Sequence, residues 1–135
     1  MKLTRRYEFS ASHRLDTPAL TPDANRDLYG KCNNPFGHGH NYVLEVTLMG
    51  SPDESGQVAS REALDALVGR RVLSRYDHRN LNADIAELNG VVPTTENIAV
   101  AIERALNEDW PLSARLDRVR IAETERNIFE LEAKR

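Results

Sequence analysis

The stretch Lys31–Tyr42 reads KCNNPFGHGHNY, and its end opens a run in which apolar and polar side chains alternate. Alternate residues of a strand share one face of a sheet, so His38 and His40 are expected to point the same way. Gly37 and Gly39 leave the backbone room beside them. Two imidazoles on one face indicate a metal site, but catalytic zinc usually takes three protein ligands.

The third ligand is expected from the beginning of the chain. Over residues 3–13 the odd-numbered positions are mostly apolar and the even-numbered positions are mostly polar. His13 is the last of the odd-numbered positions. This alternation predicts a half-buried strand. If that strand pairs with the strand that begins at His40, three imidazoles can meet. His13, His38 and His40 are therefore the candidate metal ligands, and imidazole suits zinc as well as iron, nickel and copper.

The remaining elements follow from periodicity, caps and breakers. Ser60 and either Thr94 or Thr95 can cap helices, and Pro111 ends the second one. Residues 14–31 contain prolines and little periodicity, which predicts a long loop. The expected elements are strands at 3–13, 42–49, 115–123 and 128–133 and helices at 60–72 and 95–110. This ββααββ order predicts an α+β domain, with an antiparallel four-stranded sheet and both helices on one face.

Size and charge narrow the class of protein. With 135 residues, one domain over 1–135 is expected. The net charge of −3 provides no basic field for nucleic acid, and no apolar run is long enough for a membrane span. A single cysteine and an N-terminus without an apolar signal region favour the cytoplasm. A four-stranded sheet leaves two open edges, so assembly into a homo-oligomer is expected.

Three further positions are candidates for chemistry. Cys32 can be a buried apolar residue, a fourth ligand in a closed structural site, or a reactive thiol, and composition does not separate these. If Cys32 is a reactive thiol, it needs a base. His78, polarised by Asp77, is a candidate for that base, although Asp77 and His78 can equally be structural. Glu123 ends the apolar parity of its strand, either at the solvated end or facing a pocket. In a pocket, its carboxylate could accept two parallel hydrogen bonds from a guanine- or pterin-like edge.

Five motifs in order along the chain resemble one enzyme family. They are FSASHRL at 9–15, GKCNNPFGHGHNY at 30–42, YDHRNLN at 76–82, TTENIA at 94–99 and ETERN at 123–127. Together they are similar to the 6-pyruvoyl-tetrahydropterin synthase family and span nearly the whole chain. The resemblance implies the tunnelling fold (T-fold) and trimers that pair into hexamers, with each active site between subunits.

The resemblance also implies roles for the candidate residues. Zinc would be the cofactor, held by His13, His38 and His40. Cys32 would accept a proton, assisted by Asp77 and His78. The substrate would be 7,8-dihydroneopterin triphosphate, which loses triphosphate. Glu123 would anchor the pterin ring, with Thr94 and Thr95 beside it.

Two other functions remain open from the sequence. The related 6-carboxytetrahydropterin synthase of the queuosine pathway shares the fold, the zinc site and the substrate, but releases acetaldehyde. Its usual motif has three residues between the cysteine and HGH, whereas five separate Cys32 from His38 here, which favours the pyruvoyl product. The more distant alternative is a non-catalytic zinc-binding module closed by Cys32.

Overall fold

The computed structural model describes residues 1–135, and its centre is a pair of long strands, β1 (Lys2–His13) and β2 (His38–Met49). They run antiparallel over their full length, with Ala11 opposite His40 and His13 opposite His38. Residues directly opposite each other share a face, so all three histidines lie on the same side of the sheet. The predicted strand pairing is therefore confirmed.

The sheet continues beyond β2 through two further antiparallel strands. β4 (Arg115–Ala122) pairs with β2, and β5 (Ile128–Glu132) pairs with β4. Each of the four long strands falls within or close to the span that alternation predicted. Glu123 follows the last residue of β4 and keeps the parity of the buried Val119 and Ile121.

Two parts of the predicted architecture are wrong. The sheet has five strands in the order β3-β1-β2-β4-β5, because β3 (Arg79–Asn80) pairs in parallel with β1 at Ala11 and Ser12. The sheet is thus mixed, and the simple ββααββ order is not what the chain forms. The predicted loop 14–31 contains the helix α1 (Pro22–Tyr29) and the start of a 3-10 turn over Gly30–Asn33.

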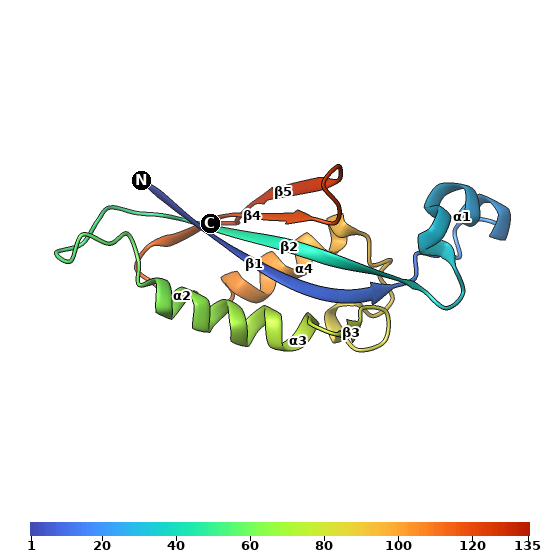
Figure 1. The fold of residues 1–135 in the computed structure, drawn as a ribbon, viewed down its shortest axis with the longest axis horizontal. Coiled ribbons are helices and arrows are strands. Elements are labelled where there is room, and N and C mark those ends of the chain that lie inside the picture. The colour runs from blue at the N-terminus through green and yellow to red at the C-terminus, as the bar shows by residue number, and fades with distance from the viewer.

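The helices α2 (Arg61–Val68), α3 (Ser74–Tyr76) and α4 (Thr95–Asn107) lie on one side of the sheet, whereas α1 lies beyond the end of β1 and β2 (Figure 1). A π-helical turn, Gly69–Leu73, joins α2 to α3, and a short 3-10 turn, Ala86–Leu88, precedes α4. Ser60 and Thr94 cap α2 and α4 by accepting hydrogen bonds from Ala63 N and Asn97 N.

The hydrophobic core fills the layer between these helices and the sheet. It contains 23 buried residues, with Tyr42, Leu44, Val46 and Leu48 of β2 fully buried. His40 has the same parity as these four, so it lies at the end of the core-facing row of β2. The core therefore holds the candidate metal ligands at one end of the sheet. No helix is both long and apolar enough to cross a membrane.

Candidate active site

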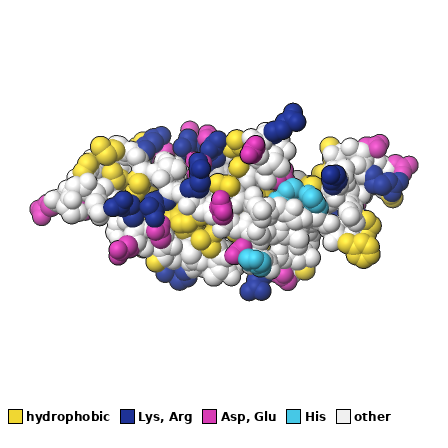
Figure 2. Space-filling model, viewed as in Figure 1, with side chains coloured by type: hydrophobic (Ala, Val, Ile, Leu, Met, Phe, Trp, Pro, Cys, Tyr) yellow, Lys and Arg dark blue, Asp and Glu magenta, His cyan; other side chains and the backbone are white.

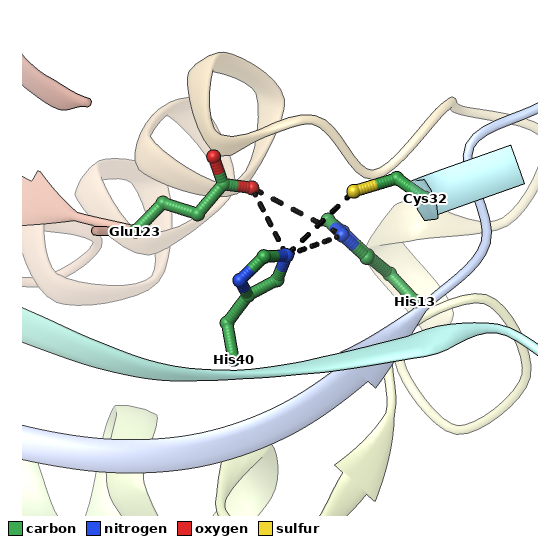
Figure 3. Close-up of side chains that lie close together, drawn as sticks. All are labelled: His13, Cys32, His40 and Glu123. Carbon is green, nitrogen blue, oxygen red and sulfur yellow. Dashed lines mark hydrogen bonds and ion pairs between the residues drawn. The ribbon is translucent and has the colours of Figure 1, made fainter. Parts of the chain in front are cut away.

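Four side chains that can bind a metal converge on the helix side of the sheet, where β1 and β4 end and β2 begins. They are His13, Cys32, His40 and Glu123, and one ligand atom from each lies within 4.8 Å of all the others (Figure 3). The Nε2 atoms of His13 and His40 are 3.1 Å apart. The Cys32 Sγ lies 3.7 Å from His40 Nε2, and Glu123 Oε1 lies 3.4 Å from it. We call these four residues the donor cluster.

His13 is oriented by a backbone carbonyl. Its ring is buried, and its Nδ1 lies 2.9 Å from the carbonyl oxygen of Pro93. A carbonyl can only accept, so Nδ1 carries the proton and Nε2 presents its lone pair to the donor cluster. A metal-ligating histidine usually has such a partner for its other nitrogen. Burial lowers the pKa of both His13 and His40, which favours the neutral imidazole that a metal requires.

Cys32 is held by the backbone around it. Its carbonyl accepts a hydrogen bond from Leu15 N at 2.7 Å, and the side-chain amide of the next residue, Asn33, donates through Nδ2 to Leu15 O at 2.7 Å. These bonds tie the 3-10 turn to the chain just beyond His13. Burial, followed by the nearby charge of Glu123, raises the pKa of the Cys32 thiol. The thiol therefore stays protonated at neutral pH unless a positive charge is bound beside it.

Glu123 faces the histidines, with a side chain that is mostly buried, rather than standing at a fully solvated strand end. Figure 3 shows one carboxylate oxygen directed at His13 and His40 and the other directed away from them. Its Oε1 is 4.0 Å from His13 Nε2. The negative charge of Glu123 opposes the effect of burial on the pKa of both imidazoles. A carboxylate here can approach a cation or accept hydrogen bonds from a ligand.

His38 lies beside the donor cluster without being one of its four members. Its ring is edge-on to that of His40, with the ring centroids 4.6 Å apart. It shares the face of His13 and His40 because it stands opposite His13 in the strand pairing. The structure thus places all three histidines together, while the closest group of ligand atoms includes Cys32 and Glu123 in place of His38.

Asp77 and His78 lie away from Cys32, at the edge of the sheet where β3 pairs with β1. Asp77 Oδ1 accepts from Ser10 N at 2.9 Å and lies 3.1 Å from His78 Nδ1. The His78 side chain is 83% exposed. The expected pair therefore forms, but it does not contact Cys32 of the same subunit.

Thr94 and Thr95 begin α4 directly after the carbonyl that holds His13. Thr94 is occupied as the helix cap. Thr95 is buried, and its Oγ1 has no hydrogen-bond partner. A buried hydroxyl without a partner is uncommon in native structures, because burying it unpaired costs free energy. The Thr95 hydroxyl is therefore available to a bound ligand or to a second subunit.

Comparison with known proteins places this arrangement in a family. The family model for 6-pyruvoyl tetrahydropterin synthase matches residues 2–134. The chain belongs to the 6-pyruvoyl tetrahydropterin synthase family. It is 42% identical over 127 residues to 6-pyruvoyl tetrahydrobiopterin synthase of Poecilia reticulata, which covers 93% of this chain and 86% of the relative.

Structural similarity within the family is equally extensive. The 6-pyruvoyl tetrahydropterin synthase of Caenorhabditis elegans superimposes with a TM-score of 0.89 at 36% identity, covering 99% of this chain and 96% of that one. A protein of Archaeoglobus fulgidus described as a 6-carboxy-5,6,7,8-tetrahydropterin synthase is 37% identical over 94 residues, 70% of this chain and 74% of its own. The match to the pyruvoyl enzymes is thus longer and closer than the match to this carboxy relative.

Several residues that support the site were not identified from the sequence. Pro93 provides the carbonyl that orients His13, and Asn82 clamps the next residue, Arg14, by accepting from its N at 2.7 Å and donating to its O at 2.9 Å. Tyr42 is fully buried, with its hydroxyl 3.4 Å from His13 Nδ1. Parity alone could have found Tyr42, because it follows His38 and His40 on the same face of β2. The other contacts join distant parts of the chain.

Replacing Gly37 with alanine is expected to damage the site. Gly37 has a φ of +82°, and a Cβ added there would lie 3.0 Å from the carbonyl oxygen of His13. The left-handed conformation costs an L-residue roughly 1–2 kcal/mol, and contact with the His13 backbone would add to that. Gly37→Ala should therefore lower the free energy of unfolding in urea and weaken metal retention.

Gly56→Ala is the matched control, because Gly56 also has a φ of +82° but has no atom near an added Cβ. It should show the loss from backbone strain alone and leave metal retention unchanged. Equal metal retention in the two variants would contradict the inferred contact between Gly37 and the His13 backbone.

Proposed function

We propose that this protein is a zinc-dependent 6-pyruvoyl tetrahydropterin synthase. It converts 7,8-dihydroneopterin triphosphate into 6-pyruvoyl-tetrahydropterin with loss of triphosphate. The observation that carries this proposal is the donor cluster, because it brings imidazole nitrogens, a thiol and a carboxylate to one point in a chain that belongs to this family. The chemistry requires these groups: a metal site, a proton acceptor and an anchor for the pterin.

The donor set fits zinc. Neutral imidazoles and a thiol are preferred zinc ligands, and the Nε2 atoms of His13 and His40 approach to 3.1 Å with Nδ1 of His13 already committed to Pro93. We propose that His13, His38 and His40 hold the metal. The ring of His38 is close enough to that of His40 to complete the set. When bound, zinc supplies a Lewis acid that polarises the hydroxyl groups of the substrate side chain.

Glu123 is proposed to bind the pterin ring. The 2-amino group and the adjacent ring N–H of a pterin form a donor edge, and a carboxylate can accept both hydrogen bonds at once. The second Glu123 carboxylate oxygen points away from the histidines (Figure 3), which leaves it free to accept from such a ligand. Thr94 and Thr95 are proposed to line the same pocket, and the buried, unpaired Thr95 Oγ1 supports that role.

Cys32 is proposed to move a proton on the substrate side chain, assisted by Asp77 and His78. Because Asp77 and His78 do not contact Cys32 of their own subunit, we infer that they act at the Cys32 of a neighbouring subunit. The exposure of His78 and its φ of +60° support this, since a non-glycine residue in that conformation is uncommon and such strain is concentrated at functional sites.

Assembly of several copies is part of the proposal. Beyond its short pairing with β3, most of β1 is an open sheet edge, and β5 forms the other edge. Unpaired edges of this length favour pairing with another chain. We propose a trimer or a hexamer that forms through these edges. We also propose that the protein is located in the cytoplasm, whose reducing conditions keep a single free cysteine as a thiol.

Product analysis tests the proposed reaction. Purified protein incubated with 7,8-dihydroneopterin triphosphate should release triphosphate and yield 6-pyruvoyl-tetrahydropterin, identified by mass spectrometry. A carboxypterin together with acetaldehyde would instead identify a 6-carboxytetrahydropterin synthase and overturn the pyruvoyl assignment. Absence of turnover in the zinc-loaded protein would favour the non-catalytic module.

A further inference from the structure

A polar hollow lies at the edge of the sheet next to Asp77. It has a volume of about 570 Å³ and is lined by Ser10, Ser12, Asn41, His78, Arg79 and Asn80. We call it the β3 hollow. Its lining contains one hydrophobic residue, so it suits a strongly polar ligand rather than a flat aromatic ring. The roles proposed above use His78 and His40, both of which line this hollow, and leave its other polar residues unexplained.

Arg79 provides the positive charge of the β3 hollow. It is the one arginine or lysine that lines it, it is exposed, and its guanidinium makes no hydrogen bond or ion pair. Figure 2 shows a histidine over the region of β3, apart from the other histidine patch on this face, with a basic side chain beside it. Arg14, which is next to His13 in sequence, is by contrast already occupied by Asp16 and the Asn33 carbonyl.

Negative charge in the β3 hollow is limited and already engaged. Asp84 is the one carboxylate that lines it, and its Oδ2 accepts a hydrogen bond from Asn80 N at 2.9 Å. The hydroxyl of Ser12 and the amide nitrogen of Asn41 can donate to an anion, whereas the Ser10 hydroxyl already donates to Asn41 Oδ1 at 2.6 Å. A free guanidinium surrounded by neutral donors is the arrangement that binds phosphate oxygens.

We propose that the β3 hollow binds the triphosphate group of the substrate and that Arg79 is its principal ligand. This rests on the proposed function, and it assigns the part of the substrate that the donor cluster leaves unassigned. When the C–O bond to the triphosphate breaks, its electron pair leaves with the phosphate oxygen, so the leaving group gains negative charge. A guanidinium directed at that charge stabilises the transition state as well as the bound substrate.

The position of Arg79 next to His78 fits this assignment. Both residues line the β3 hollow and are adjacent in sequence. If His78 lies beside the Cys32 of a neighbouring subunit, Arg79 therefore lies near that active site as well. The proton acceptor acts on the side chain of the substrate, and the triphosphate is attached to that same side chain. One short segment, Asp77–Asn80, would then serve both proton transfer and departure of the leaving group.

Binding of inorganic triphosphate to the zinc-loaded protein tests the proposal directly. Because a charged hydrogen bond is lost, Arg79→Ala should weaken binding by about 10- to 100-fold in calorimetry. Arg79→Lys should recover part of that loss, because it restores the charge without the fork of donors. Zinc content is measured after each titration, because triphosphate also binds metal ions.

The matched control is Arg61→Ala, since Arg61 is also an exposed arginine without a side-chain partner but lies on α2. It should bind inorganic triphosphate as the parent does. Binding of 7,8-dihydroneopterin, which lacks the phosphates, should be unchanged by Arg79→Ala. The KM for the triphosphate ester should rise and kcat should fall in that variant alone.

The outcomes separate this inference from the proposed function. Unchanged triphosphate binding by Arg79→Ala would overturn the role of Arg79, whatever the enzyme produces. Equal weakening of 7,8-dihydroneopterin binding would also overturn it, because Arg79 would then act on the pterin or on the fold. Failure of the parent protein to turn over the ester would refute the proposed function, while the calorimetric comparison would still decide whether the β3 hollow binds triphosphate.

Discussion

His13→Ala is expected to leave the protein without its metal and without activity. His13 is buried at the end of β1, with Nδ1 held by the Pro93 carbonyl and Nε2 directed into the donor cluster. No other side chain can replace that nitrogen, because its position depends on a backbone contact from a distant loop. Metal analysis after dialysis should find essentially no zinc, and turnover should fall below detection.

His40→Ala and His38→Ala should have the same effect if the three histidines form the ligand set. His78→Ala is the control, because His78 is exposed and lies outside the donor cluster, so it should retain zinc even if turnover falls. Since alanine at position 13 leaves a buried cavity, His13→Asn should be measured beside it, with urea unfolding to verify the fold. Full zinc occupancy in all three alanine variants would refute the metal site. Zinc loss in His13→Ala and His40→Ala but not in His38→Ala would exclude His38 from the ligands.

Most of the fold could be predicted from the alternation of apolar and polar residues. A strand with one buried face must show this alternation whichever strands it pairs with. The alternation placed the long strands correctly and put His13, His38 and His40 on the core-facing side. The same parity argument placed Glu123 with Val119 and Ile121. Such predictions depend only on local sequence, which is why they were correct.

The parts that were wrong depend on turn chemistry and on distant contacts. The prolines of residues 14–31 predict a loop, yet proline is favoured in the first turn of a helix: Pro22 begins α1, and Thr21 caps it by accepting from Ala24 N. β3 has only two residues, too few for any periodicity, and exists because it pairs with β1. Likewise, no local pattern could show that Asp77 and His78 would lie at the sheet edge away from Cys32.

Cys32→Ala is expected to retain zinc while turnover falls sharply. The Sγ lies 3.7 Å from His40 Nε2, near enough to be either a fourth ligand or a proton acceptor beside the metal. A closed structural site would need the thiolate as a ligand, whereas a catalytic site keeps one position open for substrate. Because burial raises the pKa of the thiol, its deprotonation depends on positive charge brought by a bound metal, as proton transfer during turnover would require.

The two functions of Cys32 therefore predict opposite results for the metal. Loss of a positioned acid–base group typically slows a reaction by about 10²- to 10⁴-fold, and Cys32→Ala should show a loss of that size in kcat with zinc content equal to the parent. The fold should be preserved, because the surrounding turn is held by the Cys32 carbonyl and the side-chain amide of Asn33 rather than by the thiol. Cys32→Ser should be equally slow, since a hydroxyl is a far weaker acid than a thiol. Zinc loss in Cys32→Ala would instead identify Cys32 as a ligand and favour the closed, non-catalytic site.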